Sequence, residues 1–99
     1  MVKVKRLGKF SEQLRELSVE SLELNKSIEK RILLFINNPS DTRLDNHPLT
    51  KRMNGKWAFS ITDDIRIVYE WISRTTVRLR EIGPHSRVYS RAKKQSPKR

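Results

Sequence analysis

Three strand-like runs joined by two short turns occupy residues 57–82, and this pattern constrains the fold more than any other feature of the chain. Residues 57–62 and 76–82 alternate apolar and polar side chains, as half-buried strands do. Residues 65–72 are apolar on nearly both sides, which is typical of a central strand. Asp63 and Asp64 form the first turn, and residues 73–75 form the second. The chain is therefore expected to build a sheet centred on residues 65–72.

The first 38 residues predict one strand followed by two helices. Residues 2–7 begin with alternating apolar and basic side chains, as a half-buried strand does. Ser11 begins the first expected helix, and Pro39 ends the second because it disfavours helical geometry in the residue before it. Ser18 and Ser21 interrupt the helical pattern, which predicts a tight corner in a hairpin of two antiparallel helices. The apolar stripes on which this prediction rests are Phe10, Leu14 and Leu17, and then Leu24, Ile28, Ile32 and Phe35.

The resulting element order is β-α-α-β-β-β, an α+β fold. Residues 39–56 are rich in proline, asparagine, aspartate and glycine and are expected to form a loop, and Gly83-Pro84 is expected to stop the last strand. A short final element is expected around residues 87–89. With 99 residues the chain has room for one domain, which we place at 1–89, followed by a basic tail at 90–99.

The charge of the chain indicates a polyanionic partner. Lys and Arg number 22 against 11 Asp and Glu, a formal net charge of +11, and the excess lies in residues 1–9, 39–56 and 87–99. Nucleic acid is the first candidate partner and an anionic membrane surface the second. For residues 93–99 the alternative is a tail that only aids solubility. The absence of cysteine excludes disulfides, cysteine-based zinc sites and thiol catalysis. No membrane span or signal-peptide core is present, so we expect a cytoplasmic protein with no membrane partner.

The two faces of the expected sheet differ in chemistry. Because side chains alternate along a strand, Trp57, Phe59 and Ile61 share one face with Val77 and Leu79 and are expected to pack on the helices. Arg78 and Arg80 then point to the opposite face, as does Arg66 in the central run. A sheet face studded with arginines is suited to binding phosphates. The alternative is an ordinary solvated sheet face.

Two histidines in turn-rich segments are the strongest candidates for proton transfer. His47 lies in Asn46-His47-Pro48-Leu49 and His85 in Gly83-Pro84-His85-Ser86. Histidines near cations suit RNA cleavage by attack of a 2′-hydroxyl, in which a base removes a proton, cations stabilise the phosphorane, and an acid protonates the leaving oxygen. The candidate cations are Arg66, Lys51 and Lys56, and the candidate proton carriers are His85, His47, Asp64 and Tyr89.

Each of these residues also has a structural alternative. His47 could cap a loop, and Asp64 could be only a turn residue. Tyr89 could be a core or edge aromatic, or could stack on an RNA base. Two histidines 38 positions apart without clustered carboxylates do not indicate a metal site, and no cofactor is expected.

The ensemble of motifs resembles the RelE/ParE toxin superfamily, and its RelE/YafQ-like branch in particular. The resemblance runs from Val2 to about Tyr89, nearly the whole chain. It implies a twisted, mostly antiparallel sheet with an N-terminal helical hairpin. It also implies a ribosome-dependent toxin that cuts mRNA in the A site without a metal, and whose partners are the ribosome, mRNA and a cognate antitoxin. The segments that carry the resemblance are Asn46-His47-Pro48-Leu49, residues 53–59, residues 64–69, Ile82-Gly83-Pro84-His85 and Val88-Tyr89.

The resemblance also implies roles for single residues. Arg66 matches the arginine that holds the scissile phosphate, and His85 matches the histidine favoured as general acid. Tyr89 matches the aromatic residue that stacks on or orients the mRNA base. Asp64 and His47 match an acidic site residue and a loop histidine of YafQ-like members. Lys51 and Lys56 match basic loop residues that contact RNA. Apart from the resemblance, Arg78 and Arg80 of the arginine-bearing sheet face are expected to contact RNA, and so is Arg87.

Three positions depart from the family pattern. Ser60 stands where YafQ-like members place another histidine, His85 stands where RelE-like members use an arginine, and Lys51 replaces a glycine. The division of acid and base roles is therefore left open. Two other functions remain as alternatives: a ParE-like inhibitor of DNA gyrase, and an RNA-binding module without catalysis. The antitoxin is expected to wrap an acidic, partly disordered segment over the basic surface.

Overall fold

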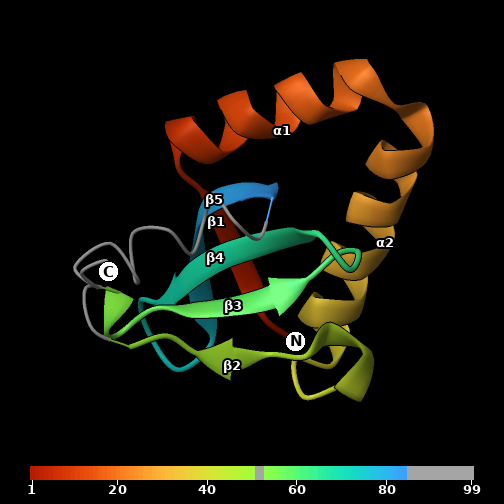
Figure 1. Cartoon of the computed structure of the whole chain (residues 1–99). Helices are drawn as coiled ribbons and strands as arrows, with labels where there is room; N and C mark the ends of the chain where they lie inside the picture. Colours follow the sequence, from red (N-terminus) through yellow and green to blue (C-terminus); the bar gives the residue numbers. More distant parts are fainter. Residues whose placement is uncertain (51–52, 85–99) are drawn as a thin grey trace, which may run out of the picture.

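The three strand-like runs form the centre of the sheet, as the sequence predicts. In the computed structural model, which describes residues 1–50 and 53–84, they are β3 (Trp57–Ser60), β4 (Ile65–Trp71) and β5 (Thr76–Pro84). β3 pairs with β4 and β4 with β5, both antiparallel, so β4 is the middle strand (Figure 1).

Two edge strands complete the sheet. β1 (Lys3–Arg6) pairs parallel with β5, and the two-residue strand β2 (His47–Pro48) pairs antiparallel with β3. Within the described residues the strand order is β1-β5-β4-β3-β2. The α+β class and the mostly antiparallel sheet are confirmed, with β1 as the parallel exception.

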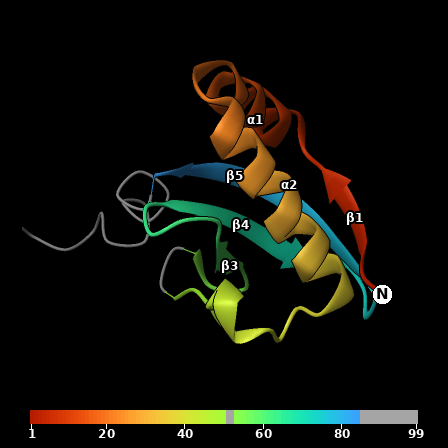
Figure 2. The same ribbon diagram turned by 90° about the vertical axis from the view of Figure 1, so that its right-hand side faces the viewer.

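The helices α1 (Gly8–Glu20) and α2 (Leu22–Asn37) are separated by a single residue, Ser21. Ser21 Oγ accepts a hydrogen bond from the backbone N–H of Leu24 at 3.1 Å and so caps α2, and Ser18 Oγ donates to Asn25 Oδ1 at 2.8 Å. The predicted corner is confirmed. Figures 1 and 2 show the helices diverging from this corner, so the pair is more open than the antiparallel hairpin expected.

The two helices pack on different parts of the sheet. α2 crosses one face (Figure 2), and Ile28, Ile32 and Phe35 from it are buried in the main core. α1 lies along β5, where Gln13 Oε1 accepts a hydrogen bond from the N–H of Ile82 at 2.9 Å. This contact satisfies a donor on the part of β5 that extends beyond β1.

The main core lies between α2 and the sheet. Phe35 stacks on Phe59 with ring centroids 4.5 Å apart, and Tyr69 meets Phe35 edge-on at 4.8 Å. Phe59, Ile61, Val77 and Leu79 all belong to this core and Trp57 packs at its border, which confirms the predicted apolar face.

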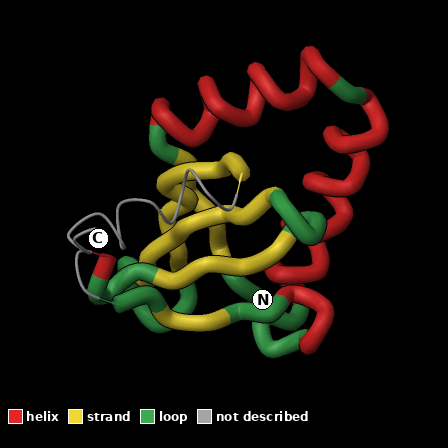
Figure 3. Tube along the Cα trace, viewed as in Figure 1, coloured by secondary structure: helices red, strands yellow, loops and turns green. Residues whose placement is uncertain are grey.

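Several element bounds differ from those predicted. α1 begins at Gly8 rather than Ser11. The expected loop 39–56 contains a 3-10 turn, η1 (Thr42–Leu44), and the strand β2; Figure 3 shows these short elements between stretches of loop. β2 was missed because it is two residues long and includes Pro48, which an edge strand tolerates.

The last strand was expected to span residues 76–82, but β5 also includes Gly83 and Pro84, and Pro84 pairs with Ile65. Proline lacks only the backbone donor, and at a strand end the remaining ladder accommodates that loss. The short element expected around 87–89, like the tail 90–99, lies outside the described residues.

Candidate functional site

The candidate site lies on the sheet face opposite α2, which we call the arginine face and define by Arg66, Glu70, Arg78 and Arg80. Side chains directly opposite each other in a ladder share a face. Ser60 pairs with Arg66, and Glu70 pairs with Arg78. The arginines therefore lie opposite the main core, as the alternation predicts.

A β-bulge in β5 allows Arg80 to join this face. Val68 pairs with Glu81 and Tyr69 with Leu79, so Arg80 is an extra residue in the ladder. The bulge shifts the alternation by one residue, which returns Ile82 to the main core and leaves Glu81 on the arginine face. A simple period of two through the whole of residues 76–82 is thus incorrect.

A second apolar cluster covers part of the arginine face. Leu49 and Met53 pack on Ala58 and Val68, and all four are buried. Leu49 and Met53 therefore lie against the sheet, and His47 lies at the border of this cluster because it pairs with Ala58 in the β2–β3 ladder.

The turn before β2 sets the orientation of His47. Asp45 adopts a left-handed conformation with φ 49°, and its carbonyl oxygen lies 2.7 Å from His47 Nδ1. A carbonyl only accepts hydrogen bonds, so Nδ1 carries the proton. In the neutral ring Nε2 is then the nitrogen that can take up a proton.

Asn46 anchors the same turn to the core. Tyr69 donates its hydroxyl hydrogen to Asn46 Oδ1 at 2.8 Å, and Asn46 Nδ2 donates to the carbonyl of Pro39 at 3.0 Å. The Tyr69 side chain is fully buried, and this burial raises its pKa to about 12. Asn46 therefore anchors the loop to the core, and the adjacent His47 faces the site.

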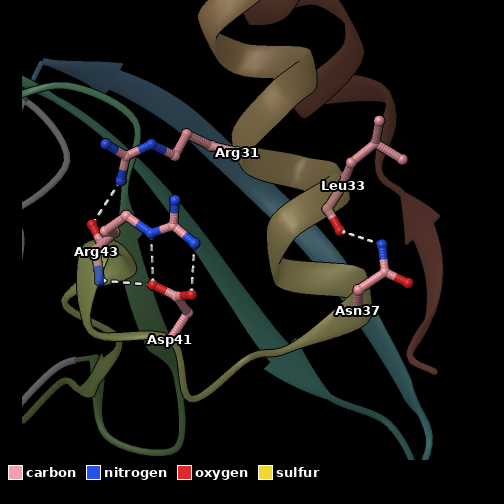
Figure 4. Close-up of polar contacts among 5 residues, drawn as sticks. All are labelled: Arg31, Leu33, Asn37, Asp41 and Arg43. Carbon is pink, nitrogen blue, oxygen red and sulfur yellow. Dashed lines mark hydrogen bonds and ion pairs between the residues drawn. The ribbon is translucent and has the colours of Figure 1, made fainter.

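A further set of polar contacts ties the start of this loop to α2 (Figure 4). Asp41 accepts hydrogen bonds from the backbone N–H, Nε and Nη2 of Arg43 at 2.9, 2.9 and 2.8 Å. The hydrogen bond from the Arg43 side chain lowers the pKa of Asp41 from 3.8 to about 2. Arg31 of α2 donates to the carbonyl of Arg43, which connects the loop to the helix.

Arg66 is the central cation of the site. Its Nη1 donates to the carbonyl of Thr62 at 2.6 Å, which directs the side chain along the β3–β4 turn. Its Nε is buried and has no hydrogen-bond partner among the described residues. A buried donor without a hydrogen-bond partner is unusual in a folded protein.

Asp64 and Lys56 are placed less centrally. Asp64 is an exposed turn residue whose N–H donates to Thr62 Oγ1 at 3.2 Å, and within the described residues its carboxylate makes no hydrogen bond or ion pair. Lys56 is half-buried just before β3, and its backbone carbonyl accepts from Leu49 at 2.8 Å. Neither side chain is brought onto Arg66 by a described contact. The remaining predicted site residues, Lys51, His85, Arg87 and Tyr89, lie outside the described residues.

Two acidic residues of the arginine face were missed by the sequence analysis. Glu70 Oε2 accepts from Arg78 Nη1 at 3.2 Å and from Arg80 Nη1 at 2.9 Å. Glu81 is 5% exposed and lies 3.6 Å from Lys9 Nζ of α1. The signal for Glu70 was its place in an otherwise apolar run, but only the register shows that it faces two arginines.

The part of the chain that the structure describes contains no group of three or more His, Asp or Glu residues arranged to hold a metal ion. Over the same residues, neither helix is long and apolar enough to cross a membrane.

Comparison with solved structures identifies several proteins of the same fold. YafQ from E. coli BL21(DE3) superposes with a TM-score of 0.74 at 19% identity, covering 90% of this chain and 99% of that one. The YoeB/ParE toxin from Agrobacterium tumefaciens gives 0.72 at 19% identity, covering 85% and 99%. YafQ in the E. coli DinJ-YafQ toxin-antitoxin complex gives 0.69 at 17% identity, covering 89% and 97%.

No family model matches the sequence, and neither does any curated protein. This chain shares its fold over nearly its whole length with the YafQ and YoeB toxins.

Proposed function

We propose that this chain, which has the fold of the YafQ and YoeB toxins, is the toxin of a toxin–antitoxin pair and cuts mRNA in the ribosomal A site. The observation that carries the proposal is Arg66. Its guanidinium lies on the arginine face with a buried Nε that has no partner among the described residues. Arg66 as a whole is only half-buried, and a guanidinium offers five N–H donors suited to charge-assisted hydrogen bonds with a phosphate.

The reaction proposed is transfer of the phosphoryl group within the RNA. The 2′-oxygen attacks the adjacent phosphorus and loses its proton to a base, the bond from phosphorus to the 5′-oxygen breaks, and an acid protonates that oxygen. The products are a 2′,3′-cyclic phosphate and a 5′-hydroxyl. Arg66 stabilises the charge that develops on the phosphorane.

The proton-transfer roles follow from the orientation of His47 and from the family resemblance. His47 donates from Nδ1 to Asp45, so its Nε2 is suited to accept the 2′-hydroxyl proton. His85 is proposed as the acid and Tyr89 as the residue that stacks on the base, both from the resemblance alone. Asp64, exposed in its turn, is assigned a supporting orientation role.

The test is primer extension on mRNA in a reconstituted translation system. Wild type is expected to produce discrete A-site cuts, and Arg66→Ala is expected to lose about 100-fold or more in cleavage rate, because a donor to the transition state is removed. Arg15→Ala removes the same charge from an exposed position of α1, outside the arginine face, and is the matched control. If wild type makes no cuts, the endonuclease proposal is rejected, and a DNA gyrase supercoiling assay tests the alternative function.

The second part of the proposal is a cognate antitoxin that covers the basic surface and keeps the toxin from the ribosome in the cytoplasm. It is supported by the net charge of +11 and by the DinJ-YafQ complex, in which a neighbour of the same fold is bound to its antitoxin. Co-expression with the adjacent reading frame is expected to give a stable complex and to relieve toxicity. Neither effect would be seen if the chain acts without such a partner.

A further inference from the structure

Arg78 and Arg80 stand side by side on the arginine face because one carboxylate oxygen holds both. Glu70 Oε2 accepts from Arg78 Nη1 at 3.2 Å and from Arg80 Nη1 at 2.9 Å. Arg78 lies opposite Glu70 in the ladder, and the bulge brings Arg80 to the same face. The two guanidinium groups are thus placed close enough to contact one phosphate together.

The charges around this pair do not balance. Lys5 pairs with Arg78 in the β1–β5 ladder, so it shares this face, as does Lys3 two residues before it. Both lysines are exposed, and the Arg78 and Arg80 side chains are 37% and 32% exposed. Glu70 shares this end of the face with four cations, and Glu81, the other acidic residue of the face, lies 3.6 Å from Lys9 Nζ, so this end of the face stays positive.

The two arginines retain donors for a ligand. A guanidinium has five N–H groups, and in the described structure each arginine uses only Nη1 for a hydrogen bond. Glu70 therefore restrains the side chains without using their remaining donors. Because the arginine side chains are already restrained, they lose less conformational entropy when their guanidinium groups bind a phosphate.

We propose that Arg78 and Arg80, positioned by Glu70, form a second phosphate-binding site for RNA, separate from Arg66. The choice of RNA rests on the proposed function, because both sites lie on the same sheet face. Glu70 is four residues from Arg66 on β4, about 13 Å at about 3.3 Å per residue. We therefore assign to the second site a different phosphate of the bound RNA from the one held by Arg66.

The test measures binding of the full-length protein to a single-stranded RNA oligonucleotide whose 2′-O-methyl groups block cleavage, over a range of salt concentrations. The variant is Arg78→Gln/Arg80→Gln. Loss of two phosphate contacts is expected to reduce the slope of log K against log salt by about 1.4 and to weaken binding alike for all sequences. The control Lys26→Gln/Lys30→Gln removes equal charge from exposed positions of α2, and its slope is expected to stay close to that of wild type.

The triple variant Glu70→Gln/Arg78→Gln/Arg80→Gln guards against misfolding, because it leaves no unpaired carboxylate behind. A folded double or triple variant with the wild-type slope would overturn the inference, and so would a slope reduced equally by the α2 control. Weaker binding to polyglutamate with unchanged RNA binding would also overturn it, by assigning the pair to an acidic protein.

The inference and the proposed function can fail separately. Arg66→Gln is expected to abolish cleavage while keeping the part of the slope that depends on Arg78 and Arg80. If wild type cuts no mRNA but the double variant still reduces the slope, the nuclease proposal fails and the second site stands. If wild type cuts mRNA and the slope does not change, the nuclease proposal stands and the second site fails.

Discussion

Replacement of Tyr69 by phenylalanine tests the link between the core and the turn that presents His47. The variant keeps the buried ring but removes the hydroxyl that donates to Asn46 Oδ1 at 2.8 Å. A neutral hydrogen bond contributes about 1 kcal/mol, and an acceptor left unpaired adds up to about 2 kcal/mol more. Tyr69→Phe is therefore expected to lower the free energy of unfolding at pH 7 by about 1 to 3 kcal/mol.

The same residue makes a separate prediction at alkaline pH. Burial raises the pKa of Tyr69 to about 12, against a usual value of 10.0. A group whose pKa is raised in the folded state contributes stability below pH 10, and that contribution is lost as the pH rises toward 12. A shift of this size corresponds to about 2 to 3 kcal/mol. The stability of wild type should thus fall more steeply over this range than that of Tyr69→Phe.

Urea denaturation of both proteins at pH 7, 10, 11 and 12 measures the two effects together. Lysine deprotonation affects both proteins equally, so the difference between them reports Tyr69 alone. The difference should shrink above pH 10 and vanish or change sign near pH 12. A constant difference from pH 7 to pH 12 would refute the reasoning, because it would show that the hydroxyl ionises as readily in the folded chain as in the unfolded one.

Two other predictions concern the core and the loop. Phe35→Ala removes a fully buried ring stacked on Phe59 and should cost about 3 to 5 kcal/mol, measured by thermal or urea unfolding; a cost near zero would mean that the ring is not packed as described. The pKa of Asp41 is lowered to about 2, so its contribution to stability is present above pH 4 and lost as the pH falls from about 4 to 2. In the Asp41→Asn variant, the free energy of unfolding should fall less between about pH 4 and pH 2 than in wild type, as measured by unfolding curves over a pH series. An equal fall in both proteins would contradict the role of Arg43 in lowering the pKa of Asp41.

The sequence predicted the parts of the fold that depend on local patterns. The period-two runs identified β3, β4 and β5, and Ser21 marked the helix corner because its side chain caps α2. β2 and the end of β5 depend on pairing with a neighbouring strand, which overrides the local preferences of Pro48 and Pro84. The bulge at Arg80 depends on the register of two strands, and no local pattern reveals a register.

The site was predicted in part, for a related reason. Alternation placed Arg66, Arg78 and Arg80 on one face, but it could not show that Glu70 holds two of them. It also could not show that Asn46 reaches Tyr69, a residue 23 positions later in the chain. Contacts between distant segments follow from the folded arrangement rather than from spacing. The roles of His85 and Tyr89 stay predictions.

The pairing of β1 with β5 has a consequence for how the chain folds during its synthesis. Val4 lies beside Val77 in a parallel ladder. The first strand that the ribosome makes therefore cannot pair until the last strand of the sheet has been synthesised. The helices can form early from local contacts, but closure of the sheet requires contacts between residues far apart in sequence, which slows folding. β1 therefore stays without its ladder through most of translation. The complete sheet, and with it the row of cations from Lys5 to Arg78, assembles only when nearly the whole chain has emerged.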